Sequence, residues 1–441
     1  MGRPAGAQGR GPLFQALRSR NYRIFFLGQG LSCVGTWMQQ VAAGWLLYRM
    51  TGSPFLLGAA AFAGQVPTFF MAPIAGVLAD RWDRKLLLLT TQVVSLAQAL
   101  ALGLLALSGA VRVWHVLALG VVLGLATAFE VTLRHSFVVD LVEEREDLGN
   151  AIALNSTLVN VARLAGPAAA GVLISLWGEG ACFLLNALSY VPMIAALLAL
   201  RVKTRTRPKE ALHPLRALRE GFEYTFRFVP IRTLVILLSL VAFLGMPHSV
   251  FLPVFAKEVL GGGPRTLGFL SGASGAGALG GSLYLARRGG VLGLGRVVAV
   301  ATALFGGGLV LFAVSRQLWV SMACLAAVGF GLMVHLAAGN TMAQAVMDDD
   351  KRGRVTSFFV VAFVGMTPLG SLLGGALAHL VGAPAVVGVG GAACVASAAW
   401  FAARRRAIRE IVRPFYARAG IVPEEGSGIC DIPGLSPPRD P

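Results

Sequence analysis

Long apolar runs separated by short polar segments repeat along the whole of this 441-residue chain. Each run has roughly 20 residues, enough for a helix rising ~1.5 Å per residue to cross a hydrocarbon core ~30 Å thick. The runs are continuous and do not alternate with polar positions, so they predict helices rather than the strands of a membrane barrel. We predict twelve membrane spans, at residues 22–48, 54–79, 84–108, 113–140, 150–177, 180–200, 231–257, 265–286, 291–314, 318–346, 353–380 and 384–403.

The composition supports an all-α membrane protein. Hydrophobic residues make up 56% of the chain and the mean hydropathy is +0.71, whereas soluble domains are only about 45–50% apolar. The 55 glycines fit this class, because small residues let membrane helices approach closely. The five cysteines have no spacing typical of a metal site or a disulfide framework, so we predict neither a metal nor a cofactor.

No motif of an enzyme is found in the chain. The glycine-rich run at 272–281 lies inside a span and follows no strand, so it indicates helix packing rather than a dinucleotide loop. A phosphate-binding Gly-Lys-Ser/Thr loop is also missing from the sequence, which argues against ATP as the energy source.

The basic residues are distributed unequally between the two sides of the predicted spans. Of the 38 Lys and Arg residues, 31 lie in segments or span ends on one side and five on the other, and the remaining two, Arg134 and Arg163, lie deep within spans. The positive-inside rule then predicts a multi-pass protein of the inner (plasma) membrane with both termini in the cytoplasm. The same distribution explains the net charge of +17 without a nucleic-acid partner, because basic loops face the anionic inner leaflet.

The longest break between spans divides the twelve into two groups of six. Residues 201–230 form a basic linker, and 214–228 within it are expected to form an amphipathic helix on the membrane surface. We therefore predict an N-terminal bundle at 1–200, the linker, a C-terminal bundle at 231–405 and a disordered cytoplasmic tail at 406–441. Weak similarity between the halves supports a duplication, which is one known transporter design.

The segment GVLADRWDRK, residues 76–85, holds five charges between two apolar runs. It resembles the signature loop of the major facilitator superfamily, Gly-x-Leu-Ala-Asp-Arg-x-Gly-Arg-Lys, with Asp83 in place of the usual glycine. Segments such as EVTLRHSFVVDLV and RGRVTSFFVVAFVGMTPLGSLLGGALA resemble the branch that holds the enterobactin exporter and macrolide-efflux proteins. The resemblance implies the major facilitator fold, with twelve helices in two pseudo-symmetric six-helix bundles, in a monomeric exporter driven by proton antiport.

We predict that the charged loop is part of a gate. The N-terminal amides of span 11 favour a carboxylate nearby, and ion pairs between the halves would close the cytoplasmic side in one state and break in the other. The alternative is that the loop only sets topology. The residues assigned to this gate are Gly76, Asp80, Arg81, Arg84, Lys85, Arg352 and Arg354.

Glu130 is the one acidic residue deep within a predicted span, and Arg134 follows it one helical turn later. Ionisable groups in a membrane are rare and line a cavity or pair with each other. We predict that Glu130 carries the coupled proton, with Arg134 as its partner; the alternative is a permanent ion pair that only stabilises its span. His335 is a second candidate, since an imidazole titrates near neutral pH.

A central binding site is expected between the halves. Arg163 is at mid-depth in span 5 and would bind an anionic substrate group or pair with Glu130; otherwise it bonds backbone carbonyls. Polar and aromatic residues in spans 1 and 5 either face the cavity or bond neighbouring helices. These residues are Gln29, Trp37, Gln39, Gln40, Asn155 and Asn160.

The sequence therefore predicts a proton-coupled exporter of an amphipathic small molecule, such as a drug, macrolide or siderophore, working by alternating access. Two alternatives stay open. The first is an uptake transporter, because only the resemblance favours export over import. The second is a membrane sensor or scaffold that moves no solute.

Overall fold

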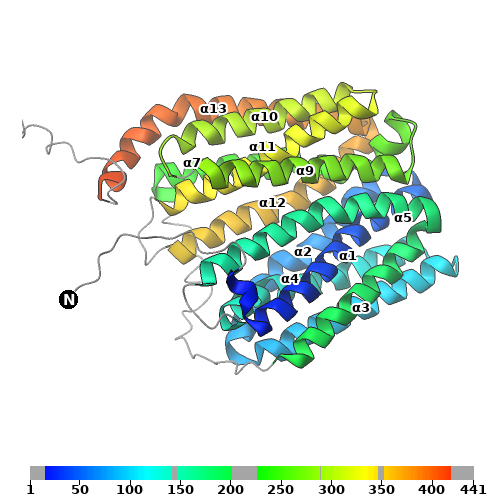
Figure 1. The fold of residues 1–441 in the computed structure, drawn as a ribbon. Helices are drawn as coiled ribbons and strands as arrows, with labels where there is room; N and C mark the ends of the chain where they lie inside the picture. Colours follow the sequence, from blue (N-terminus) through cyan, green and yellow to red (C-terminus); the bar gives the residue numbers. More distant parts are fainter. Residues whose placement is uncertain (1–14, 142–146, 201–225, 289, 346–351, 419–441) are drawn as a thin grey trace, which may run out of the picture.

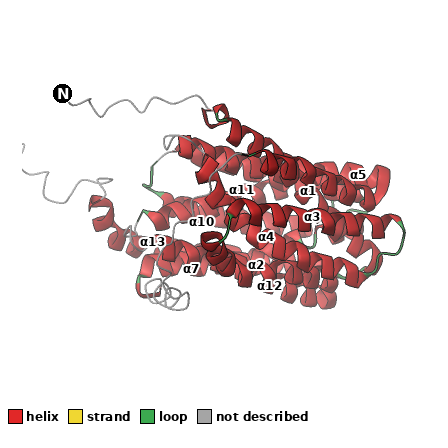
Figure 2. Cartoon of the chain, turned by 90° about the horizontal axis from the view of Figure 1, so that it is seen from below, coloured by secondary structure: helices red, strands yellow, loops and turns green. Residues whose placement is uncertain are grey.

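The computed structural model describes residues 15–141, 147–200, 226–288, 290–345 and 352–418. This part of the chain is almost entirely helical and contains no strand (Figure 2). The N-terminal helices are α1 (Arg20–Thr51), α2 (Pro54–Arg81), α3 (Arg84–Leu107), α4 (Val113–Leu141) and α5 (Leu148–Ala199). The C-terminal helices are α7 (Val229–Leu240), α9 (Pro264–Arg288), α10 (Leu294–Val314), α11 (Leu318–Gln344), α12 (Arg352–Val381) and α13 (Ala383–Arg418).

Between α7 and α9 the helical path is irregular. It continues from α7 through the π-turn η3 (Val241–Gly245) and the 3₁₀ turn η4 (Met246–Ser249), then through α8 (Leu252–Val254) to the second π-turn η5 (Phe255–Val259). Pro247 and Pro253 lie in this stretch, and each removes a backbone donor from the helical ladder. The whole path from Val229 to Val259 is nevertheless long and apolar enough to form one span.

Local sequence signals set the helix ends. Asp83 caps α3, since its carboxylate accepts a 2.8 Å hydrogen bond from the Lys85 amide. Ser53 caps α2 in the same way and is followed by a proline in the first turn. Gly178, at φ 78° and ψ 176°, reverses the chain inside α5, so this long helix is two antiparallel spans. Gly382, at φ 86°, makes the turn from α12 to α13.

The helices lie in two groups, which we call the N-half (α1–α5) and the C-half (α7–α13), lower and upper in Figure 1. α1 begins and α13 ends at the same end of the bundle (Figure 1). We call this the basic end, because most described arginines lie there, among them Arg20, Arg84, Arg296 and Arg405. The other end, with the Gly178 and Gly382 turns, is the opposite end.

The buried core differs between the two ends. At the opposite end one apolar cluster runs through both halves and includes Trp45, Leu57 and Phe183 of the N-half together with Phe251 and Leu325 of the C-half. At the basic end, the described residues form two separate clusters, so the core there is divided. One cluster belongs to the N-half, with Tyr22, Phe25, Leu133, Phe137 and Met193, and another belongs to the C-half, with Leu234, Val298, Met342, Phe401 and Ile408.

The predicted all-α membrane fold is confirmed. Nine helices in the described part of the chain are long and apolar enough to span a membrane. α1 and α9 are not among these nine, and α5 counts once although Gly178 divides it, so the arrangement is consistent with twelve spans.

One prediction on the tail is wrong. Residues 406–418 were expected to be disordered, but they continue α13 without a break. The reason is local: this stretch has alanine and arginine, which favour helix, and buried Ile408 and Val412 anchor it to the C-half. The proposed linker boundaries and the amphipathic helix at 214–228 stay predictions, since 201–225 lie outside the described residues.

Candidate functional site

A polar cluster joins α1 to α4 inside the N-half. Arg134 Nη1 lies 3.5 Å from Glu130 Oε1, and Gln29 Nε2 donates to the same oxygen at 3.3 Å. Cys33 completes the group, with its sulfur 3.2 Å from Gln29 Nε2 and 3.9 Å from Arg134 Nη1. Glu130 thus has a cation and an amide beside one carboxylate oxygen. The spacing of Glu130 and Arg134 predicts the cation, whereas Gln29, a predicted binding residue, bonds the neighbouring helix.

This cluster lies deep in the bundle but is not sealed. Glu130 is ten residues before Asp140, which pairs with Arg84 at the basic end, so it lies ~15 Å from that end at the helical rise. The Glu130 side chain keeps 16% of its surface exposed, while Gln29 keeps only 2%. Arg134 Nε is buried and has no hydrogen-bond partner among the described residues, so the pair is incompletely satisfied.

A second cation lies between α5 and α1. The Arg163 guanidinium carbon is 5.0 Å from the centre of the Trp37 ring, within the range of a cation–π contact. Arg163 Nε is also buried without a hydrogen-bond partner among the described residues. The structure pairs Arg163 with Trp37, two of the residues predicted to bind substrate. Within the described part of the chain, Arg163 forms no ion pair with Glu130 and no hydrogen bond with a backbone carbonyl.

The other predicted binding residues are placed differently. Gln39 is buried in a network inside the N-half: it donates to Gln98 at 2.8 Å and accepts from Asn186 at 2.6 Å. Asn160 donates to the Ser156 carbonyl of its own helix at 3.0 Å. Gln40 is exposed and Asn155 is half-buried. Gln39 therefore links neighbouring helices and Asn160 bonds its own helix, whereas Gln40 and Asn155 keep accessible polar groups.

His335 lies in the C-half, apart from the Glu130 cluster. Its Nδ1 is 2.8 Å from the hydroxyl of Thr302 on α10, and both residues are buried, at 3% and 0% exposure. His248 is similar, with Nδ1 2.6 Å from the Gly245 carbonyl and 4% of its surface exposed. Each histidine thus has a fixed local partner.

At the basic end, the described part of the predicted gate is held within the N-half. Arg84 pairs with Asp140 of α4 at 3.0 Å, and Lys85 Nζ donates to the Leu200 carbonyl at 2.8 Å. A side chain at Gly76 would meet nothing within 4 Å. The side chains of Asp80, Arg81, Arg352 and Arg354 lie outside the described residues, so contacts between the halves at this loop stay a prediction.

At the opposite end the two halves bond directly. The Tyr48 hydroxyl at the end of α1 donates to Glu258 of η5, and the Lys257 ammonium lies 5.6 Å from the centre of the Tyr48 ring. Arg265 of α9 donates to the Ser175 hydroxyl of α5 at 2.9 Å. We did not predict this group from the sequence, because Tyr48 and Glu258 are 210 residues apart and each alone is typical of a span end.

Backbones also approach closely toward that end. A Cβ added to Gly171 of α5 would lie 2.8 Å from Gly268 Cα of α9, and a Cβ on Gly375 of α12 would lie 3.1 Å from Gly58 Cα of α2. Contacts this close between helices need glycine. Among the described residues, every contact between the halves that involves a glycine or a side-chain hydrogen bond lies at mid-depth or toward the opposite end.

Proteins similar in sequence are transporters. The chain is 25% identical over 356 residues to the staphyloferrin A transporter of Staphylococcus aureus, covering 80% of this chain and 88% of that protein. It is 23% identical over 368 residues to macrolide efflux protein A of Streptococcus pyogenes, with 82% and 90% covered. It is 26% identical over 362 residues to the multidrug efflux pump Tap of Mycobacterium bovis, with 80% and 85% covered.

Solved structures share the fold at low sequence identity. A bacterial homologue of the iron transporter ferroportin, in an inward-facing state, has a TM-score of 0.68 at 18% identity and covers 87% of this chain and 98% of its own. An inward-facing, unoccupied bacterial homologue of the lysosomal transporter Spinster has a TM-score of 0.66 at 16% identity, with 93% and 99% covered. The family model described as transmembrane secretion effector matches residues 12–412. The chain therefore belongs to the transmembrane secretion effector family of the major facilitator superfamily and is a multi-pass membrane transporter, not an enzyme.

Proposed function

We propose that this transporter exports an amphipathic small molecule by alternating access, exchanging it for protons, and that it works as a monomer with its basic end in the cytoplasm. The excess of Lys and Arg at the basic end supports this orientation. In that orientation the described state is closed toward the outside, and it is the state in which an exporter receives its substrate.

The observation that carries the proposal is the divided core. One apolar cluster holds both halves together at the opposite end, while the basic end has a separate cluster for each half. A rigid scaffold gains no stability from keeping a separate core in each half at one end. A transporter that alternates between two states has its halves joined at one end and separated at the other in each state.

Glu130 is our candidate for the proton site. Its carboxylate lies deep in the N-half, is still 16% exposed, and has Arg134 3.5 Å away. A proton on Glu130 would release Arg134 from its ionic partner, and loss of that proton would restore the pair. The local contacts of His335 with Thr302 favour a packing role for this second candidate.

Arg163 and Trp37 are our candidates for contact with the substrate. Together they offer a positive charge and an aromatic face, and the unpaired Arg163 Nε is a donor for an anionic or carbonyl oxygen. An amphipathic molecule with a ring or apolar body and one polar oxygen group fits this pair. Siderophores, macrolides and drugs, the molecules in the names of the relatives, all lie in this range.

The test is uptake into inverted membrane vesicles that contain the protein and carry an inside-acid gradient. The panel holds a cationic dye, a macrolide and a carboxylate siderophore. We expect one compound to accumulate inside the vesicles. We expect this accumulation to disappear when a protonophore collapses the gradient. Accumulation only with the opposite gradient would indicate uptake instead of export. If none of a widened panel moves in either direction, the scaffold alternative replaces the proposal.

A further inference from the structure

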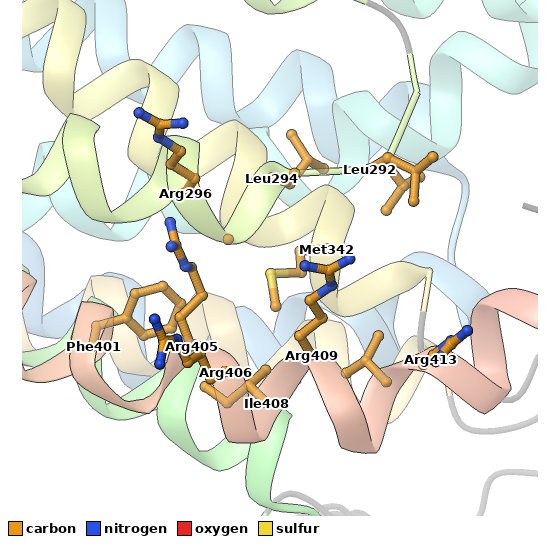
Figure 3. Close-up of a pocket in the computed structure, with 14 residues that line it drawn as sticks. Leu292, Leu294, Arg296, Met342, Phe401, Arg405, Arg406, Ile408, Arg409 and Arg413 are labelled. Carbon is orange, nitrogen blue, oxygen red and sulfur yellow. The ribbon is translucent and has the colours of Figure 1, made fainter. Parts of the chain in front are cut away.

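A cavity of about 680 Å³ lies at the basic end of the C-half, separate from the polar cluster of the N-half. It is formed between the turn before α10, the start of α10, the end of α11 and the last part of α13 (Figure 3). Its volume is in the range of ligand-binding pockets and far exceeds the space of a single small ion. The lining residues are Val291–Arg296, Met342, Phe401, Arg405, Arg406, Ile408, Arg409, Val412 and Arg413.

The charge of this cavity has one sign. Five arginines line it, and none of its lining residues is acidic; Glu410, on the same helix, is not part of the lining. Three of the five, Arg405, Arg409 and Arg413, follow each other at intervals of four and so share one face of α13. In Figure 3, Arg405 and Arg409 rise from α13 into the space below α10.

The floor of the cavity is apolar and well packed. Phe401, Ile408 and Val412 of α13 have exposures of 0%, 2% and 2%, and Met342 of α11 has 5%. These residues belong to the core cluster of the C-half. Above this packed floor, Leu292 of the lining is 55% exposed and offers the accessible apolar surface. The cavity therefore combines guanidinium groups with an apolar wall, a combination that a purely solvated arginine face lacks.

Neighbouring elements hold this arrangement in place. Arg288 donates to the Leu292 carbonyl at 2.9 Å and so fixes the turn before α10. Gly293, at φ 77°, starts α10 without a capping side chain, and the positive end of the helix dipole faces this region. A Cβ on Gly295 would lie 3.5 Å from Arg405 Cγ, so the Arg405 stem packs against the first turn of α10.

We propose that this cavity binds an anionic phospholipid, with its phosphodiester among the arginines and the start of an acyl chain against the apolar wall at Leu292. Arginine binds phosphate oxygens through paired donors, and basic pockets between spans on the inner face bind anionic headgroups. The cavity lies where α10 begins and α11 ends, and lipid headgroups are expected at the ends of spans. A soluble phosphate would use the charges but leave the apolar wall without an occupant.

The test measures lipid binding to the purified full-length protein in detergent by native mass spectrometry. Dioleoylphosphatidylglycerol and dioleoylphosphatidylcholine differ in headgroup charge but share their acyl chains, and glycerol 3-phosphate supplies the phosphate without the chains. We expect the wild type to bind phosphatidylglycerol tightly, phosphatidylcholine weakly and glycerol 3-phosphate weakly. This comparison needs no variant, so it holds even if a variant folds poorly.

The variant R405Q/R409Q removes two charges from the cavity, and R287Q/R404Q removes two from the same end outside its lining. At the usual contribution of a basic residue near anionic lipid, the first is expected to bind phosphatidylglycerol about 25-fold more weakly. The second is expected to change binding by no more than about fivefold. Equal losses in the two variants, equal binding of both lipids by the wild type, or competition by glycerol 3-phosphate as effective as by phosphatidylglycerol would overturn the proposal.

Discussion

At the scale of single residues, the state of Glu130 depends on three partners from two helices. Arg134 contributes charge, Gln29 contributes a hydrogen bond to the same oxygen, and Cys33 packs against both. A charged carboxylate within a membrane is costly unless it is paired, so Glu130 would respond to a movement of Arg134 away from it. The arrangement supports a role in coupling and gives it a direct test.

For Glu130→Gln we expect gradient-driven uptake into inverted vesicles to fall to the level of passive leak. The amide keeps the shape and a hydrogen-bond acceptor but does not bind or release a proton. Movement of the substrate down its own gradient should therefore continue. The matched variant is Glu179→Gln, which weakens the 2.7 Å ion pair with Arg49 at the opposite end. The Arg49 side chain is 56% exposed although Glu179 is buried, so the pair is worth about 1 kcal/mol, and we expect transport to persist. Full gradient-driven uptake by Glu130→Gln would show that the ion pair is only structural.

The sequence predicts part of this residue-scale detail. The Glu130–Arg134 pair follows from spacing on one helix, and the structure has it. The contacts of Glu130 with Gln29, of Arg163 with Trp37 and of Tyr48 with Glu258 join different helices. Such contacts depend on how helices pack and rotate, which a single sequence leaves open.

At the scale of elements, glycine positions decide where the halves close. Gly171 and Gly268 let α5 and α9 approach to backbone contact, because neither helix has a Cβ there. The helix ends themselves were predictable: the expected spans at 54–79, 84–108 and 113–140 match α2, α3 and α4 within two residues. Hydropathy and turn residues, which are local signals, indicate such ends. The pairing of α5 with α9 depends on contacts between residues far apart in the sequence, so local signals do not indicate it.

For Gly268→Val we expect the opposite end to open. The added side chain meets α5 backbone that cannot move aside, and overpacking of this kind costs about 1–3 kcal/mol. The same free energy shifts a two-state population by roughly 5–150-fold. The measurement is the rate at which a membrane-impermeant maleimide labels a cysteine placed at Ile174, which is 6% exposed, in a background without the native cysteines.

The matched variant for this experiment is Gly120→Val, since a Cβ at Gly120 meets nothing within 4 Å. We expect it to label at the rate of the unmodified background. The cysteine at position 174 could instead be labelled as slowly in Gly268→Val as in Gly120→Val, with thermal stability unchanged. In that case, contact between Gly171 and Gly268 does not control closure.

At the scale of the whole molecule, the helical membrane fold was predictable and the conformational state was not. Composition, span length and the loop at 76–85 all indicate the architecture that the family match confirms. Under the proposed alternating access, the division of the core at one end depends on which of two packings the chain adopts. A sequence that is compatible with both packings does not indicate which of them is populated.

The measurement that tests the account most directly follows both ends of the bundle at once. Spin labels at Trp177 and Trp319 report the distance across the opposite end, and labels at Leu86 and Leu292 report it across the basic end; all four side chains are more than half exposed. Double electron–electron resonance is recorded in lipid, in acidic and in mildly alkaline medium, with and without the transported compound. We predict reciprocal changes, so that any population with a longer Trp177–Trp319 distance has a shorter Leu86–Leu292 distance. Distances that stay fixed under every condition, or that lengthen together at both ends, would contradict alternating access.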